Sequence, residues 1–210
     1  MSEAINDLDG RLDFAVAVAA EVGELIMRHF HDTELVVERK RDDSPVTAAD
    51  REAEQLIRRR VAEQWPDDGG LGEEFEETDG SNGFRWILDP IDGTKSFIHH
   101  VPLFGTLIGL EHDGQMVAGV CRMPALDEVA YGGIGLGAWW QQGGGDPRPA
   151  RVSTVQHLDQ ALFCTTTITR WRTLGRQDVF DRFCSSAALV RGWSDCYGHL
   201  LVATGRADVM

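Results

Sequence analysis

The sequence predicts an α/β fold in which helices and strands pack as separate layers. Apolar residues recur at three- and four-residue steps in two early segments, 8–30 and 49–63, which is the spacing of amphipathic helices. Short apolar runs separated by turn residues follow, as is typical of strands in a meander. Two helices followed by a meander favour a layered arrangement around a sheet.

The first predicted helix covers residues 8–30, and a short strand is predicted over 34–40. The apolar face of this helix is formed by Leu12, Val16, Ala19, Val22, Ile26 and Phe30. We expect this helix to be part of the scaffold and to carry no chemistry.

The second helix has a recognisable start. Thr47 is a candidate N-cap, and Asp50 follows three residues later, which is a short form of the capping box. The apolar face of this helix is formed by Ala49, Ala53, Leu56, Ile57 and Val61. On spacing alone, Asp50 is therefore expected to be a cap partner.

Residues 86–97 combine an apolar run with two carboxylates, a glycine and a hydroxyl. Residues 85–88 predict a buried strand, and Pro90, which cannot donate to a sheet, predicts that the strand ends near Asp89. Asp89 and Asp92 repel each other unless a cation lies between them, and Mg²⁺ binds through such carboxylates together with substrate phosphate. Thr94 is expected to cap a helix whose first N–H groups can hold phosphate. A common Asp-rich turn is the plainer interpretation.

The remaining segments predict the rest of the meander and a second set of elements. Strands are expected over 104–110, 115–121, 128–131, 137–141 and 162–166. Asp113-Gly114 predicts a tight turn between the first two of these strands. Helices are expected over 179–189 and from about Cys196 to a Gly205 cap, where Asp195 could serve simply as the N-cap.

The string Asp-Pro-Ile-Asp-Gly-Thr at 89–94 resembles the signature of the inositol monophosphatase family of Mg²⁺-dependent, lithium-sensitive phosphatases. Pro-Val-Thr-x-x-Asp at 45–50 and Gly-Glu-Glu at 72–74 resemble two further elements of that family. The resemblance implies an α/β/α/β/α sandwich of the inositol monophosphatase/fructose-1,6-bisphosphatase type. It implies an N-terminal half, 1–150, that carries the metal and phosphate site, and the start of an incomplete C-terminal half, 151–210.

The resemblance also implies roles for individual residues. It assigns the metal ligands to Glu73, Asp89, the Ile91 carbonyl and Asp92. It assigns catalysis to Asp50, Thr94 and Glu73, with Asp50 and Thr94 orienting and deprotonating the attacking water. It assigns phosphate binding to Asp92, Gly93 and Thr94, and substrate contacts to Asp195 and Glu74. Lys40 corresponds loosely to a family lysine, and the expected cofactor is Mg²⁺, with Mn²⁺ as an alternative.

One departure from the family pattern concerns the end of the chain. Family members continue to a Trp-Asp or Tyr-Asp element whose Asp completes the metal site, whereas this sequence ends at Met210. The last strands and helix of the family fold are therefore expected to be missing. A non-catalytic, metal-poor relative that acts as a binding subunit is the alternative from another functional class.

Within the family, the strings at 88–98, 102–110 and 195–205 most resemble histidinol-phosphate phosphatases, which act in histidine biosynthesis. Asp195 supports this interpretation, because a carboxylate suits a substrate that carries an amine and an imidazole better than a neutral polyol. Inositol-1-monophosphatase is the second interpretation.

Charge and composition exclude several partners. The net charge of −14 argues against nucleic acid or an anionic membrane as the main partner, and no apolar run reaches membrane-spanning length. Four scattered cysteines are typical of reduced thiols, which predicts a cytoplasmic protein. The expected partner is a small phosphate monoester, and the family habit implies a homodimer.

Overall fold

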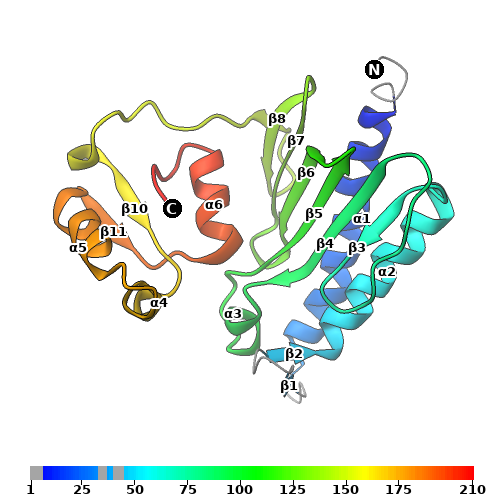
Figure 1. The fold of residues 1–210 in the computed structure, drawn as a ribbon, viewed down its shortest axis with the longest axis horizontal. Helices are drawn as coiled ribbons and strands as arrows, with labels where there is room; N and C mark the ends of the chain where they lie inside the picture. The colour runs from blue at the N-terminus through cyan, green and yellow to red at the C-terminus, as the bar shows by residue number, and fades with distance from the viewer. Residues whose placement is uncertain (1–6, 33–36, 40–44) are drawn as a thin grey trace. The chain divides into compact units, whose positions relative to one another are not determined.

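The structure is a computed structural model, and it describes residues 7–32, 37–39 and 45–210. Contacts divide the chain into two compact units, Met1–Pro149 and Ala150–Met210. The first unit contains the mixed sheet and the two long helices, and the second contains a small parallel sheet with its own helices (Figure 1). Each unit is described below by itself.

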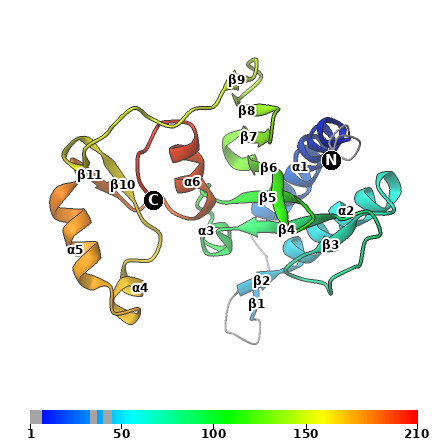
Figure 2. The same cartoon turned by 45° about the horizontal axis from the view of Figure 1, so that its top comes forward.

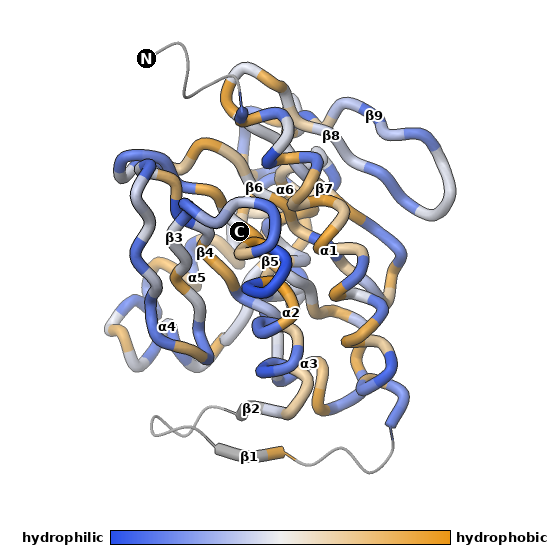
Figure 3. The backbone as a smooth tube through the Cα atoms, turned by 90° about the vertical axis from the view of Figure 1, so that its right-hand side faces the viewer, coloured by the Kyte–Doolittle hydropathy of each residue, from blue (hydrophilic) through white to orange (hydrophobic). Residues whose placement is uncertain are grey.

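Two long helices cover the sheet of the first unit, as the apolar spacing predicts. They are α1 (Leu8–Phe30) and α2 (Ala48–Gln64). Helix α1 packs on β5, β6 and β7, whereas α2 packs on β4. Figure 2 shows both helices on the same side of the sheet, and Figure 3 shows apolar stretches recurring among hydrophilic ones along them. Burial of these apolar faces forms the main core of the unit.

The sheet has the order β3-β4-β5-β6-β7-β8-β9. Its strands are β3 (Gly69–Leu71), β4 (Phe84–Asp92), β5 (Gly105–His112), β6 (Gln115–Met123), β7 (Glu128–Gly133), β8 (Gly137–Gln142) and β9 (Arg148–Pro149). β3 is parallel to β4, and every later pair is antiparallel, which confirms the predicted meander. Asp113 and Gly114 have φ values of 50° and 79°, as the predicted tight turn requires.

The short elements of the first unit lie around this sheet. They are β1 (Val37–Arg39), β2 (Pro45–Thr47), α3 (Thr94–Ile98) and the 3₁₀ helix η1 (Pro124–Leu126). β1 and β2 form an antiparallel pair, so the strand predicted over 34–40 is present in its described part. No helix in the described part of the chain is long and apolar enough to cross a membrane.

The prediction that the central strand ends near Asp89 is wrong, because β4 continues to Asp92. Asp89 pairs with Leu107 and Asp92 pairs with Gly105, so three residue steps on β4 match two on β5. This is a β-bulge, in which one extra residue leaves the regular ladder. Pro90 lies within the bulge, where its missing N–H costs no ladder hydrogen bond, and its carbonyl accepts the Thr106 hydroxyl at 2.9 Å.

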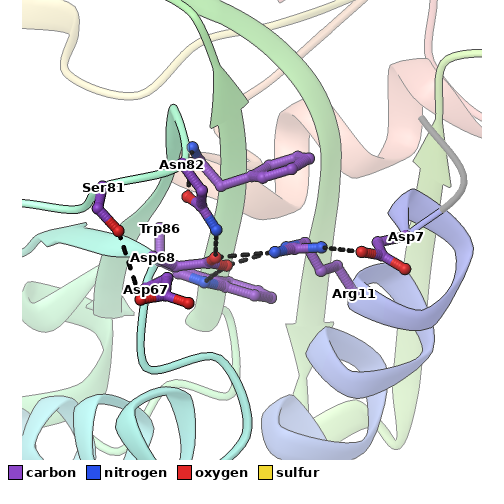
Figure 4. Close-up of polar contacts among 8 residues, drawn as sticks. Asp7, Arg11, Asp67, Asp68, Ser81, Asn82 and Trp86 are labelled. Carbon is purple, nitrogen blue, oxygen red and sulfur yellow. Dashed lines mark hydrogen bonds and ion pairs between the residues drawn. The ribbon is translucent and has the colours of Figure 1, made fainter. Parts of the chain in front are cut away.

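A buried ion pair joins α1 to the segment before β3. Arg11 donates two hydrogen bonds to the Asp68 carboxylate, at 2.8 and 2.9 Å. Trp86 and Asn82 donate to the same carboxylate at 2.9 and 2.7 Å. Figure 4 shows these side chains converging on Asp68. The Arg11 guanidinium also stacks between two aromatic rings, those of Trp65 and Phe84, at 4.0 and 3.9 Å from their centres.

The second unit contains the parallel strands β10 (Leu162–Cys164) and β11 (Leu189–Arg191). Its helices are η2 (Leu158–Gln160), α4 (Ile168–Thr173), α5 (Gln177–Ser186) and α6 (Asp195–Ala203). The helix predicted over 179–189 is wrong at its C-terminal end, because α5 stops at Ser186 and Leu189 already belongs to β11. Helix α4 was not predicted from the sequence. Thr204 is the C-cap of α6, and Gly205 follows at φ 72°.

Candidate functional site

The bulge in β4 brings two carboxylates to one face of the sheet. Side chains alternate along a strand, so residues three apart, such as Asp89 and Asp92, ordinarily face opposite ways. Their partners on β5, Leu107 and Gly105, are two residues apart and therefore share a face. Paired residues in a sheet lie on the same side, so Asp89 and Asp92 share that face too. This face is opposite to the one that packs on α1 and α2, because Leu88 and its partner Ile108 belong to the main core.

The chain turns sharply into helix α3 after these carboxylates. Gly93 is the N-cap of α3 and has φ 84°, a left-handed conformation that favours glycine. The prediction that Thr94 caps the helix is therefore wrong, because Thr94 is its first residue. The Thr94 hydroxyl donates to the Ile91 carbonyl at 3.0 Å. The hydroxyl oxygen keeps acceptor capacity for a water, and the first N–H groups of α3 have no helical carbonyl to bind.

Asp50 lies at the start of α2, where the sequence places it. Its carboxylate accepts the Thr47 backbone N–H at 2.8 Å and the Thr47 hydroxyl at 2.7 Å. A capping box is present, so the cap expected from spacing is confirmed. Asp50 is also buried, and β2, which leads directly into α2, lies beside α3. Thr94 is carried by α3, so β2 lies between the start of α2 and α3 in these contacts.

Glu73 and Glu74 follow the end of β3, on the segment between β3 and β4. β3 pairs in parallel with β4, with Leu71 level with Ile87. This pairing ends at Leu71, and the chain bends at Glu73 and Glu74. Glu73 is exposed and Glu74 is half-buried. The Glu74 backbone N–H donates to the Glu54 carboxylate at 2.7 Å.

Glu54 was missed by the sequence interpretation. It lies on α2 and is fully buried, between Ala53 and the apolar pair Leu56 and Ile57. Its two carboxylate oxygens accept hydrogen bonds from Arg58 and from Glu74. An acid at a position of the apolar helix face, with an arginine four residues later, was the signal that could have found it.

The predicted convergence of Glu73, Asp89 and Asp92 into one metal cluster is not found. Across residues 7–32, 37–39 and 45–210, no group of three or more His, Cys, Asp or Glu side chains is arranged to hold a metal ion. The physical reason lies in the ends of the strands: the bulge aligns the two aspartates of β4, whereas Glu73 extends beyond the last paired residue of β3. The donors are nevertheless all oxygen, as Mg²⁺ requires, and include two carboxylates on one face beside the Ile91 carbonyl. In their chemistry, these residues fit the cation.

Asp195 belongs to the second unit and is the first residue of α6. The N-cap is Ser194, so the expectation that Asp195 is a simple N-cap is wrong. Asp195 has φ 54°, an uncommon left-handed conformation for a residue with a side chain. Its backbone N–H donates to the Thr166 hydroxyl at 3.1 Å. Lys40 lies outside the described residues.

The chain is similar to named phosphatases along most of its length. A model of the inositol monophosphatase family matches residues 7–210. A histidinol-phosphatase of Chlorobaculum parvum is 44% identical over 198 residues, which are 94% of this chain and 74% of that protein. The histidinol-phosphatase of Mycobacterium tuberculosis is 35% identical over 94% of this chain and 76% of its own length. An inositol-1-monophosphatase of Rhizobium meliloti is 36% identical over 74% of this chain and 58% of its own length.

Solved structures show the same fold. The extragenic suppressor protein suhB of Bartonella henselae has a TM-score of 0.83 at 29% identity, covering 95% of this chain and 76% of that one. An IMPase of Thermotoga maritima has a TM-score of 0.80 at 29% identity, covering 95% and 74%. These likenesses confirm the predicted layered fold. Because the family model matches from residue 7 to residue 210, the chain belongs to the inositol monophosphatase family of phosphatases.

Proposed function

We propose that this chain hydrolyses histidinol phosphate with the help of Mg²⁺. The observation that carries the proposal is the pair of aspartates that the β4 bulge places on one face, directly before the left-handed Gly93 turn. Three relatives named histidinol-phosphatase support the choice of substrate, since they align with 94 to 100% of this chain at 34 to 44% identity. By comparison, two relatives named inositol-1-monophosphatase align with about three quarters of this chain.

Residues of β4 would bind the cation, and residues at the start of α3 would bind the phosphate. Asp89, Asp92 and the Ile91 carbonyl, with Glu73 from the neighbouring segment, would hold Mg²⁺, which when bound supplies positive charge to the phosphate oxygens and makes a nearby water easier to deprotonate. The N–H groups of Gly93 and of the first turn of α3 would bind phosphate oxygens.

Thr94 and Asp50 would aim the attacking water. The Thr94 hydroxyl donates its proton to Ile91, so its oxygen can accept a hydrogen bond from that water. Asp50, held by Thr47, would take the proton as the water attacks the phosphorus in line with the leaving oxygen. Both residues act on the reacting water and not on the substrate's carbon skeleton.

Asp195 would recognise the leaving group. A carboxylate repels phosphate, so its place is beside the positively charged amine of histidinol phosphate. Its left-handed backbone supports a functional role, because a strained conformation persists only where the surrounding structure holds it, and such conformations cluster at functional sites.

Replacing Asp195 by Asn is expected to lower kcat/KM for histidinol phosphate by roughly ten- to a hundred-fold, because a charge-assisted hydrogen bond contributes about 1.5–3 kcal/mol. Asn also tolerates the left-handed conformation, so the change removes the charge without adding backbone strain. Turnover of an aryl phosphate without an amine should hardly change. An equal loss with both substrates would show that Asp195 is structural, and no loss with either would favour a neutral polyol phosphate.

Replacing Asp89 by Asn is expected to weaken Mg²⁺ binding at least about ten-fold, because a neutral amide is a poorer ligand for a hard cation. Isothermal titration calorimetry of the wild type and the variant measures this directly. Asp113→Asn is the matched control, since Asp113 is an exposed residue of the β5–β6 turn. Equal Mg²⁺ affinities of wild type and Asp89→Asn would contradict the ligand assignment.

A phosphate-release panel tests the proposal as a whole. The panel compares histidinol phosphate, inositol 1-phosphate, fructose 1,6-bisphosphate and adenosine 3′,5′-bisphosphate in the presence of Mg²⁺ and of Mn²⁺. We expect the highest kcat/KM on histidinol phosphate. A preference for inositol 1-phosphate would instead favour the second candidate function, that of an inositol-1-monophosphatase. A homodimer in the cytoplasm belongs to the same proposal, and sedimentation velocity tests the dimer.

A further inference from the structure

Helix α2 is tied to the acidic segment 72–75 by a buried carboxylate. Glu54 is fully buried, and one of its oxygens accepts the Glu74 backbone N–H at 2.7 Å. The other oxygen accepts the Arg58 Nε–H at 2.7 Å. Both oxygens therefore have charged or backbone donors, as a buried carboxylate requires.

Arg58 makes a second connection from the same helix to the same segment. Its Nη2 donates to the Phe75 carbonyl at 3.3 Å, and its guanidinium lies 5.9 Å from the centre of the Phe75 ring. Glu54 and Arg58 are four residues apart and so lie on one face of α2. Together they hold two consecutive residues, Glu74 and Phe75. We call Glu54 and Arg58 the α2 clamp.

Gly72 shows how closely the segment approaches the clamp. A Cβ atom added at Gly72 would lie 2.0 Å from Glu54 Oε1 and 2.6 Å from Oε2. Real Cβ atoms do not come so close, and the Glu54 carboxylate is fixed by its two partners. Only glycine therefore fits at position 72 while the clamp is formed.

The clamp also relates the segment to Asp50. Asp50 and Glu54 are one helical turn apart on α2, so their side chains leave the same face of a rigid element. Glu73 lies between Gly72, which packs against Glu54, and Glu74, whose N–H binds Glu54. The position of the Glu73 backbone relative to Asp50 is consequently set by α2.

Stability alone does not account for this arrangement. A buried ion pair can often be replaced by apolar residues of similar volume at little or no cost in stability. Ala53 and Ile57, which lie next to Glu54 on the helix, are buried apolar residues, so an apolar side chain would suit the packing on that side. An apolar residue, however, could not accept the hydrogen bond from the Glu74 backbone N–H.

We propose that Glu54 is a positioning residue that holds Glu73 and Glu74 in place for Mg²⁺ binding and at a fixed distance from Asp50. The catalytic consequence rests on the function proposed above, whereas the structural part of the inference does not. Glu54 itself contacts neither the substrate nor the cation. It acts through the backbone of the 72–75 segment.

The first measurement is hydrogen exchange of the Glu74 amide in the metal-free protein. Glu54→Met removes both hydrogen bonds and keeps the apolar volume, so exchange at Glu74 should become roughly ten- to a hundred-fold faster. Glu54→Gln keeps one acceptor oxygen and should cause a smaller acceleration. Glu63→Gln is the matched control, because Glu63 is an exposed glutamate of the same helix that pairs with Arg60. Amides in the β5–β6 ladder provide the internal reference.

The second measurement is the Kd for Mg²⁺, obtained by calorimetry. Glu54→Met should raise it roughly ten-fold, with partial recovery in Glu54→Gln and no change in Glu63→Gln. Gly72→Ala leaves the clamp residues in place but must displace the segment, so it should raise the Kd as well. It serves as the test if Glu54→Met does not fold.

The outcomes separate this inference from the proposed function. Unchanged Glu74 exchange in Glu54→Met, or equal acceleration in the β5–β6 reference, would overturn the positioning role. So would an unaltered Kd for Mg²⁺ in folded Gly72→Ala. A wild-type protein that releases phosphate from none of the four esters would overturn the proposed function, and the exchange measurement would still report on the clamp.

Discussion

Replacing Asp50 by Asn is expected to lower kcat by roughly 10²- to 10⁴-fold, the usual contribution of a positioned general base, with little change in KM. Thr94→Ala should have a similar signature, since both residues are proposed to act on the water and not on the bound ester. Steady-state kinetics with histidinol phosphate at saturating Mg²⁺ measures both constants. Thr94→Ser, which restores the hydroxyl, should recover most of the activity.

The structure gives Asp50 a second role that the experiment must separate from the first. Its Oδ2 atom accepts two hydrogen bonds from Thr47 and closes the capping box of α2. Asn keeps an acceptor oxygen at this position, so the helix start and the thermal stability should be largely preserved. A large fall in Tm with a proportional fall in active protein would mean that Asp50 only caps the helix.

A control on the same helix completes the comparison. Glu52 is exposed, and its carboxylate meets His29 on α1 at 3.0 Å. Glu52→Gln removes the same charge two positions from Asp50 and should leave kcat unchanged. An equal loss of kcat in Glu52→Gln would point to the overall charge of α2 as the cause. A change confined to KM in Asp50→Asn would show that Asp50 binds substrate and does not activate water.

The sequence predicted the two long helices, α1 and α2, well because their signals are local. The apolar spacing over 8–30 and the Thr47–Asp50 pair each lie within one helix, where nearest neighbours determine the structure. The Asp-Gly turn is equally local, because two consecutive residues with positive φ define it. The resemblance in 89–94 assigns the candidate site to the C-terminal end of β4, and this assignment stays a prediction.

The bulge and the clamp could not be predicted because each depends on residues distant in the sequence. Pro90 argues for the end of a strand, yet the pairing of Asp92 with Gly105 continues β4 beyond it. In the sequence, Glu54 is one of many charged residues on its helix. Its role depends on the hydrogen bond from Glu74, which lies 20 residues later. In the second unit, β11 interrupts a predicted helix because Leu189 pairs with Leu162, which lies 27 positions earlier. Tertiary pairing overrides local preference in each case.

Glu54–Arg58 and Arg11–Asp68 are two polar pairs of the first unit with different roles. Glu54 and Arg58 hold a segment of the candidate site. Arg11 and Asp68 instead join α1 to the residues just before β3. Asp68 also accepts hydrogen bonds from Trp86 and Asn82, so four side chains from separate segments meet there. Arg11 and Asp68 are therefore expected to matter for stability and not for catalysis.

Replacing Arg11 by Met is expected to lower the free energy of unfolding by about 3–5 kcal/mol, because the Asp68 carboxylate would stay buried without its charged partner. That loss is a large share of the stability of a typical domain. Urea denaturation at pH 7 measures it. Arg60→Met is the matched control, since Arg60 makes a similar two-point contact with Glu21, at 2.7 and 3.0 Å, between the exposed surfaces of α1 and α2. The free energy of unfolding should fall much less in Arg60→Met, because water screens the charges of an exposed pair.

The effect of Arg11→Met should also depend on pH in a defined direction. Burial acts to raise the pKa of Asp68, but hydrogen bonds from Arg11, Asn82 and Trp86 outweigh it and hold the pKa below its ordinary value of 3.8. A carboxyl whose pKa is lowered by folding adds stability above its unfolded pKa, and that stability is lost as the pH falls through the folded pKa. The stability difference between wild type and Arg11→Met should therefore be constant near neutral pH and shrink below about pH 4. A difference that persists unchanged at lower pH would mean that Arg11 stabilises the fold through its stacking on Trp65 and Phe84, and not through the charge of Asp68.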